Sequence, residues 1–498
     1  MSSEVNFSDV QGLVRFGFGK LKGARYALAR IKDIEAARSW LQSAPVTNAV
    51  TMKPPPSTAL QVAFTAEGLR KLGVSESVVN SFSHEFVSGM TEPSRSRRLG
   101  DINDNAPAKW WWGGVGQEPH LVVMFFAKSE LLNGFVRDCT ESVWNEAFEV
   151  QWLYTSDLDG IEPFGFPDGI SQPKIDWSQQ RDMLAPQIDF GNIVALGEFL
   201  LGYRNEYGKY TDRPLVDADQ SSAGLLPAEE APEKRDVGRN GTYLVMRQLH
   251  QDVRGFWQFL SERAGDDAAE MEKLAAAMVG RTKAGDPLVP LQGTPIPGIG
   301  PDPDEVRQNL FTYDEDSKGI RCPFGAHVRR ANPRNTDFPG RPDKLLAKLI
   351  TMLGFGSKGF RDDLMSSVRY HRVLRRGREY GPYIPSEQAL APAARGEPEN
   401  GLHFICLNAN ILRQFEFLQN AWMMSTKFSG MTEESDPLLG NRAGIPGCPV
   451  TSHFKIQKES GLRDRLEGLR QFVVVRGGAY FFLPSLRALH YFLRVSNP

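Results

Sequence analysis

The stretch RYALARIKDIEAARSWLQ, residues 25–42, can be laid without a gap over TYLVMRQLHQDVRGFWQF, residues 242–259. The identical pairs are Tyr26 and Tyr243, Arg30 and Arg247, and Trp40 and Trp257. In both segments a strand-like apolar run precedes the spacing of an amphipathic helix. HLVVMFFAKSELLNGFVRDC (120–139) and HFICLNANILRQFEFLQN (403–420) repeat that order. Two such matches favour an internal duplication, with chance similarity as the alternative for so few identities.

A duplication of this kind predicts an α+β fold in which each half is a sheet with helices on one face, the split-βαβ arrangement. We place an N-terminal domain at residues 1–235 and a C-terminal domain at 236–498. Segments 204–240 and 262–304 lack clear periodicity and are predicted to be insertions, the first a surface segment without a role. Within the second, residues 264–280 have the pattern of a helix and 283–304 are rich in Pro and Gly.

The composition is that of a globular protein, with 41% apolar and 24% charged residues in 498. A net charge of −2 argues against a dedicated nucleic-acid binder. The four cysteines lie far apart, without a CxxC or CxxCH motif, which disfavours zinc ribbons, iron–sulfur sites and covalently attached haem. No secretory signal, twin-arginine segment or membrane-length apolar run is seen, so we expect a cytoplasmic protein that does not bind membranes.

The stretch PFGFPDGISQP, residues 163–173, places a single carboxylate, Asp168, among three prolines and two glycines. Glycine permits positive φ and close approach of the backbone to a ligand, and proline restricts φ. The pattern favours a backbone moulded around a flat or bulky group. A tight surface turn with a solvated Asp168 is the alternative.

His327 stands out among eight histidines because small residues and several arginines surround it in RCPFGAHVRRANPR, 321–334. Nearby positive charge would lower the pKa of the histidine and favour the neutral imidazole that metals bind. The arginines could also hold the carboxylates of an anionic cofactor. The alternatives are a core histidine with satisfied hydrogen bonds and a solvated basic face. The arginines are Arg321, Arg329, Arg330 and Arg334.

A second basic segment, YHRVLRRGREYGPYIP at 370–385, contains Arg375 next to Val373 and Leu374. These apolar neighbours favour an inward-pointing guanidinium, which would need an anion or a polarised ligand. An edge strand with outward charges is the alternative.

Together these segments resemble the dye-decolorising peroxidases, haem enzymes built from two tandem ferredoxin-like domains. GFPDGISQP (165–173) resembles the family's G-F-x-D-G-I-S-Q-P signature, CPFGAHVRRANPR (322–334) its proximal-histidine segment, and LRRGREYGP (374–382) its distal-arginine segment. Further matches cover most of the chain. They are QGLVRFGFGKL, GEFLLGY, RNGTYLVMRQLHQDVRGFW, MVGRTKAGDPL and GLHFICLNANI. The length, and Gly377 where compact members carry Asn, resemble the larger subgroup.

The resemblance implies a non-covalent haem b pocket, mainly in the second half, with His327 as the axial iron ligand. Asp168 and Arg375 would be the catalytic pair that acts on hydrogen peroxide. Among the remaining residues, Glu416 is the expected carboxylate partner of the second His327 nitrogen, with a solvated helical position as the alternative. The other expected cofactor contacts are Gly169, Ile170, Ser171, Gln172 and Arg329.

The implied activity is reduction of hydrogen peroxide coupled to oxidation of dyes, phenols or other aromatic donors. A haem-binding or iron-handling protein with incidental peroxidase activity is the alternative, and a module without a cofactor is a third reading. The family oxidises bulky donors through surface Trp or Tyr. The run Trp110–Trp112 is open to that role or to packing. Oligomeric state is left open, with a homo-oligomer as one option.

Overall fold

The fold is described from a computed structural model covering residues 4–141, 143–180, 193–290, 308–309, 311–334, 367–442 and 451–494. The Pro/Gly-rich segment predicted at 283–304 therefore lies outside the described residues from position 291 onward, as does Cys448. No helix in these ranges has the length and apolar character needed to cross a membrane.

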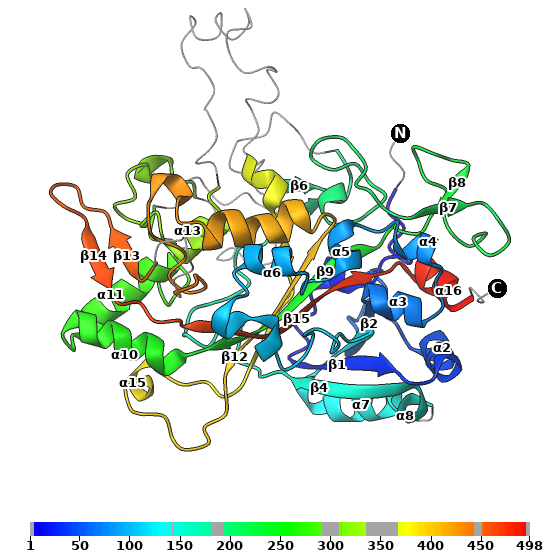
Figure 1. The fold of residues 1–498 in the computed structure, drawn as a ribbon, viewed down its shortest axis with the longest axis horizontal. Helices are drawn as coiled ribbons and strands as arrows, with labels where there is room; N and C mark the ends of the chain where they lie inside the picture. The colour runs from blue at the N-terminus through cyan, green and yellow to red at the C-terminus, as the bar shows by residue number, and fades with distance from the viewer. Residues whose placement is uncertain are drawn as a thin grey trace, which may run out of the picture.

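The first unit has the strand order β4-β1-β3-β2, all neighbours antiparallel, which is the ferredoxin-like order. Helices follow β1 and β3 along the chain (Figure 1). The elements are β1 (Gly23–Ile31), α2 (Ile34–Ser43), β2 (Thr58–Phe64), β3 (Leu121–Ala127), α7 (Leu132–Cys139), α8 (Trp144–Ala147) and β4 (Phe148–Tyr154). The apolar run at 121–126 forms β3, a fully buried central strand.

The second unit repeats this order as β15-β9-β12, with the short strands β10 and β11 both paired to β12. Its elements are β9 (Thr242–Gln251), α10 (Val253–Ala264), β10 (Leu374–Arg375), β11 (Arg378–Tyr380), β12 (Gly401–Asn408), the π-helices η8 (Leu412–Glu416) and η9 (Leu418–Met424), and β15 (Val473–Leu483). The predicted two tandem ferredoxin-like units are confirmed. A long π-helix is unusual and was not predicted.

The gapless alignment of the two segments gives the correct order of strand and helix, but it does not align the first residues of the two helices. Asp33 caps α2 by accepting a hydrogen bond from the Ala36 N–H, and Asp252 caps α10 through the Gly255 N–H. Because a short acceptor side chain satisfies the free N–H groups of a first turn, each aspartate sets the start of its helix. The caps are 219 positions apart rather than 217, so the second strand is longer before its helix begins.

The two units form one nine-stranded sheet through the antiparallel pair β15–β2, at Phe482 and Phe64. The last helix, α16 (Leu486–Arg494), returns to the first unit, where the Leu486 N–H donates to the Asp9 carbonyl. In Figure 1 this red helix lies among blue N-terminal elements. The division at 235/236 stays a prediction; it falls inside β8 (Lys234–Asp236), which pairs with β7 (Leu215–Asp217) in the insertion.

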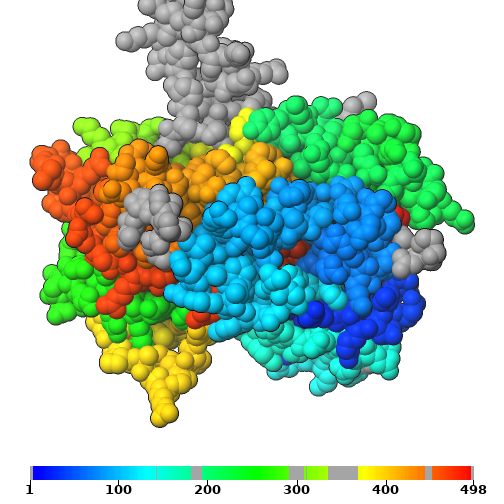
Figure 2. Space-filling view, in the orientation of Figure 1, coloured from blue at the N-terminus to red at the C-terminus, as the bar shows by residue number. Residues whose placement is uncertain are grey.

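Segments between the core strands cover the second unit. The predicted helix at 264–280 is confirmed as α11 (Ala268–Val279), capped by Asp267 and ended by Gly280 at φ +96°. Further elements are α6 (Pro93–Leu99), β5 (Lys174–Asp176), β6 (Ile193–Ala195), α13 (His327–Ala331), β13 (His453–Ile456) and β14 (Asp464–Glu467). In space filling, blue and cyan N-terminal residues abut the orange C-terminal ones over the front face (Figure 2).

Candidate active site

A cavity of about 270 Å³ opens against the sheet of the second unit. Its walls come from the loop 162–171, strands β9, β12 and β15, α13, the segment 371–377 and the π-helix η8–η9. Most of the lining side chains are apolar, including Leu249, Phe404 and Phe415, and the rest are polar or charged. A largely apolar cavity with a few converging polar groups is the usual form of a cofactor site.

The loop that carries Asp168 is shaped by its glycines and by a half-buried acid. Gly165 and Gly169 have φ of +99° and +79°, a region that side chains other than glycine rarely adopt. The Glu162 carboxylate accepts hydrogen bonds from the N–H groups of Phe164 (3.0 Å) and Phe166 (2.9 Å). It also accepts one from the Gln251 amide on β9 (2.7 Å). Burial raises the pKa of Glu162 to about 7.

Asp168 and Arg375 both line the cavity and contact each other. The Asp168 Oδ1 accepts the Gly169 N–H at 2.6 Å and the Arg375 Nη2 at 3.4 Å. Arg375 is fixed by the loop itself, because its Nη1 donates to the Ser171 carbonyl (3.2 Å) and its backbone N–H donates to the Gln172 Oε1 (3.0 Å). Of the alternatives for Arg375, the structure has the inward-pointing guanidinium, not the outward-facing one.

The remaining residues of the GISQP run do not all line the cavity. Ile170 and Ser171 line the cavity, and the Ile170 carbonyl accepts the Asn309 amide at 2.6 Å. Gln172 is not among the lining residues and acts by holding Arg375. Gly169 contributes its N–H to Asp168. The run therefore orders the Asp168–Arg375 pair as much as it forms a wall.

His327 is the first residue of α13 and lines the same cavity. Its Nδ1 hydrogen-bonds to the Asp436 Oδ2 at 3.0 Å, while the Asp436 Oδ1 accepts the N–H groups of Leu438 and Leu439 (2.9 and 2.8 Å). Within the described part of the chain, the His327 Nε2 has no hydrogen-bond partner. The ring is thus oriented through one nitrogen and leaves the other available as a ligand.

The predicted effect of the neighbouring arginines on His327 was wrong. Burial alone would lower the pKa of His327, but the Asp436 charge and hydrogen bond outweigh it and raise that pKa. Although burial opposes it, His327 in turn lowers the pKa of Asp436. The buried carboxylate of Asp436 therefore controls the imidazole.

Glu416 was the wrong partner for His327. Its carboxylate forms a buried ion pair with Arg95 of α6 (2.6 Å) and accepts the Tyr480 hydroxyl (3.0 Å). The helix after β12 does carry a buried acid, but that acid joins the π-helix to the N-terminal half. Asp436 lies 109 positions beyond His327, and no local pattern in the sequence links the two.

Arg329 also lies elsewhere. Its Nη1 donates to Asp316 (2.8 Å) and to the Cys322 carbonyl (2.6 Å), and Tyr313 packs on the guanidinium. The side chain is 2% exposed and does not line the cavity. With its charge paired inside the protein, Arg329 does not fit the expected role of holding a cofactor carboxylate.

The tryptophan run 110–112 is divided between packing and exposure. Trp110 and Trp112 are buried, with their Nε1–H groups donating to the Asn105 carbonyl and the Gln248 Oε1. Trp111 is 49% exposed and lies beneath the Arg476 guanidinium. Of the two alternatives for the run, Trp110 and Trp112 therefore fit packing.

Several known proteins are similar to this chain over nearly its whole length. No protein-family model matches the chain. The dye-decolorizing peroxidase msp1 of Mycetinis scorodonius is 28% identical over 523 residues, covering 99% of this chain and 89% of the relative. The multifunctional dye peroxidase DyP2 of an Amycolatopsis strain is 27% identical, covering 95% and 90%. A DyP-type peroxidase structure from Auricularia auricula-judae superposes with a TM-score of 0.72 at 25% identity, covering 99% of this chain and 100% of the other.

Over nearly its whole length the chain is similar to dye-decolorising peroxidases. A dye-decolorizing peroxidase structure in complex with 2,6-dimethoxyphenol shares the fold, with a TM-score of 0.70 at 23% identity, covering 99% of this chain and 100% of the other. The relatives span most of both chains, so the similarity includes both ferredoxin-like units.

Dye-decolorising peroxidases are haem enzymes, and the described residues fit such a group. His327 offers a free Nε2 at the wall of an apolar cavity, and a carboxylate fixes its other nitrogen. Metal-binding histidines commonly have a carboxylate or carbonyl acceptor on the second nitrogen. The fit extends to charge, because the cavity wall also carries Arg281, Arg372 and Arg375, as an anionic porphyrin requires.

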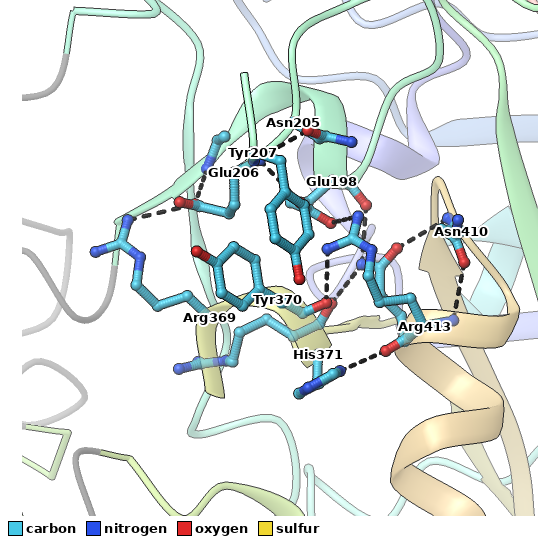
Figure 3. A network of polar contacts seen from close by, with 12 residues as sticks. Glu198, Asn205, Glu206, Tyr207, Arg369, Tyr370, His371, Asn410 and Arg413 are labelled. Carbon is cyan, nitrogen blue, oxygen red and sulfur yellow. Dashed lines mark hydrogen bonds and ion pairs between the residues drawn. The ribbon is translucent and has the colours of Figure 1, made fainter. Parts of the chain in front are cut away.

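The segment that leads into the last two arginines is firmly held (Figure 3). The Arg369 Nη2 pairs with Glu206 at 3.3 Å, and the Tyr370 ring stacks on Tyr207 with centroids 4.2 Å apart and planes 7° apart. Glu206 and Tyr207 belong to the segment 204–240, which was expected to have no role. Its first residues therefore support one wall of the cavity.

Proposed function

We propose that this chain is a haem b peroxidase that reduces hydrogen peroxide and oxidises phenolic, dye-type or similar aromatic donors. The observation that carries the proposal is that Asp168, His327 and Arg375, more than forty positions apart in sequence, line one cavity. The names of the relatives and the phenol in one related structure support the substrate class. The cofactor would be bound non-covalently, since the chain lacks CxxCH.

The proposed proximal group is His327, which would bind iron through Nε2. The haem would supply the electrons that cleave peroxide and would later recover them from the donor. Asp436 accepts the Nδ1–H and keeps the ring in the tautomer with Nε2 unprotonated. Its buried negative charge increases the basicity of the imidazole and so strengthens the ligand.

The proposed distal groups are Asp168 and Arg375. In the described structure only one Asp168 oxygen is hydrogen-bonded, by the Gly169 N–H and Arg375. The second oxygen is free to take the proton from one peroxide oxygen and return it to the departing oxygen as water forms. The Arg375 guanidinium, held by Ser171 and Gln172, would stabilise negative charge as the O–O bond lengthens.

The deciding experiment is a visible spectrum of the haem-loaded protein before and after one equivalent of peroxide. We expect a Soret band that shifts on mixing, followed by return of the band when a phenol is added. Asp168→Asn should keep the resting spectrum and slow the reaction with peroxide by roughly 10² to 10⁴-fold. Arg375→Leu should slow it by roughly 10² to 10³-fold.

The matched control is Arg476→Leu, which removes a surface guanidinium paired with Glu399 and outside the cavity lining. It should react at the wild-type rate. Stopped-flow rates equal to wild type in both distal variants would refute the assignment. A haem-bound protein without steady-state turnover would favour the alternative of a haem-binding or iron-handling protein.

A further inference from the structure

Arg372 is a buried cation that has no counter-ion in the part of the chain that the structure describes. Its residue is 8% exposed and lines the cavity. Within the described residues, its guanidinium makes no hydrogen bond or ion pair; only its carbonyl is bonded, to the Gln414 amide at 2.6 Å. Leaving a buried charged group unpaired is costly, and buried polar groups nearly always have a partner. This guanidinium therefore needs an anion that the described residues do not supply.

The rest of the cavity wall does not balance the charge. Arg281 also lines it, donates by Nη1 to the Gly285 carbonyl, and has a buried Nη2 without a hydrogen-bond partner. Of the two carboxylates in the wall, Asp168 already contacts Arg375 and Glu162 has its pKa raised to about 7 by burial. Burial lowers the pKa of Arg372 to about 10, and the nearby positive charges of Arg375 and Arg369 contribute to that lowering. Arg372 is therefore still a cation at neutral pH, in a wall with a surplus of positive charge.

The position of Arg372 is fixed by its neighbours. Figure 3 shows the preceding residue, His371, with its Nδ1 on the Arg413 carbonyl (2.5 Å). The His371 ring stacks on Phe417 at 3.6 Å, and Arg413 is paired with Glu198 at 2.6 Å. With the Arg369 and Tyr370 contacts described above, each of the three residues before Arg372 is tied to the surrounding structure. The backbone that carries Arg372 is thus fixed at the cavity wall, which places its guanidinium within reach of a ligand there.

We propose that Arg372 binds a propionate carboxylate of the porphyrin and so sets the orientation of the cofactor in the cavity. This inference rests on the proposed function. Guanidinium and carboxylate match in geometry and form charge-assisted hydrogen bonds, which are the strong ones in partly buried sites. A resident carboxylate fits the burial better than the carboxylate of an exchanging donor, because a permanent counter-ion removes the cost of the unpaired charge throughout the catalytic cycle.

The test compares protein loaded with haemin and protein loaded with haemin dimethyl ester, which lacks both carboxylate charges. The rate of porphyrin loss to excess apomyoglobin is followed by absorbance. We expect the ester to leave the wild-type protein about 10 to 100 times faster than haemin, the range of one to two charge-assisted hydrogen bonds. Arg372→Gln should bring haemin loss close to the ester rate and leave the ester rate almost unchanged. Arg372→Lys should recover part of the difference.

Arg476→Gln is the matched control and should keep the wild-type ratio of ester to haemin. Equal loss rates of the two porphyrins from the wild-type protein would overturn the inference without any variant. An unchanged ratio of ester to haemin loss rates in Arg372→Gln would also overturn it. The same holds if Arg372→Gln changed only the concentration of para-hydroxybenzoate, a phenolic carboxylate donor, that saturates turnover and left that of its methyl ester unchanged. If neither porphyrin gives a Soret band that depends on His327, the proposed function itself fails.

Discussion

The two ferredoxin-like units share a strand order but differ in what lies between sheet and helices. In the first unit, Trp144 packs against Trp40 and Phe148 with ring centroids 4.7 and 4.8 Å apart, and the space is filled. In the second unit the π-helix η8–η9 follows β12. Residues of this π-helix border the cavity rather than filling the space against the sheet. The same topology thus gives a closed core in one half and a cofactor-sized space in the other.

The groups of the proposed chemistry come from segments outside the repeated elements. Asp168 lies in the connection between the units, His327 lies on α13, and Arg375 lies at the edge strand β10. The paired sheet supplies a rigid apolar wall, while irregular segments supply the polar groups. A duplicated fold can therefore carry a site in one copy only.

The largest expected effect distinguishes two histidines, one in each unit. His327→Ala should lose the axial ligand, so that the Soret band shifts and peroxide turnover disappears. His120→Ala should keep both, because the His120 Nδ1 accepts the Ile31 N–H (2.8 Å) and serves only the first sheet. That variant should lose about 1–3 kcal/mol of unfolding free energy for the unsatisfied N–H. Spectra and urea unfolding test both, and altered ligation in His120→Ala would contradict the comparison.

The filled and open cores should respond differently to truncation. Trp144→Ala should lower the unfolding free energy by about 3–5 kcal/mol, because it removes a large ring from a packed cluster. Phe404→Ala should cost clearly less in the cofactor-free protein, since Phe404 already borders the cavity. In the haem-loaded protein the order of effects on porphyrin retention should reverse. Equal losses of stability in urea unfolding would show that the two cores are packed alike.

Variants of two buried carboxylates near the π-helix should affect different properties, one the retention of haem and the other the stability of the fold. Asp436→Asn should weaken haem retention by about 10 to 100-fold, the usual effect of removing a carboxylate behind a metal-binding histidine. Glu416→Gln should leave ligation unchanged and cost about 3–5 kcal/mol of stability, because Arg95 loses its buried partner. Porphyrin-transfer rates and unfolding curves measure the two effects. The opposite assignment of effects would restore Glu416 as the partner of His327.

The smallest expected effect is a pH dependence that belongs to the second unit. The folded-state pKa of Glu162, about 7, lies above its ordinary value of 4.5 because of burial. The stability that this carboxyl contributes is present below about pH 4.5 and is lost as pH rises through 7. Between about pH 5 and 8, the cofactor-free protein should lose on the order of 2 kcal/mol relative to Glu162→Gln, because the group is half-buried.

Glu149, exposed on β4 of the first unit, provides the control for that measurement. Glu149→Gln should leave the pH dependence of unfolding as it is in the wild type. Parallel curves for Glu162→Gln and the wild type would show that Glu162 does not titrate with folding.

The predictions from sequence succeeded where local patterns carry the information. Strand and helix periodicity, with aspartate caps, gave the repeated elements and the helix ended by Gly280. The Gly/Pro loop around Asp168 and the apolar neighbours of Arg375 pointed to inward-facing groups, and both line the cavity. The errors concern partners. Asp436 and the unpaired state of Arg372 depend on contacts between distant segments, and no spacing in the chain records them.

By itself, the sequence determined the order of the repeated strands and helices and which side chains were candidates for the site, because these follow from periodicity and residue chemistry within short windows. Only the tertiary structure decided which charges meet. Ion pairing depends on distances of a few ångströms between residues far apart in the chain. For that reason Arg329 and Glu416 are neutralised inside the protein, while Arg372 is left facing the cavity.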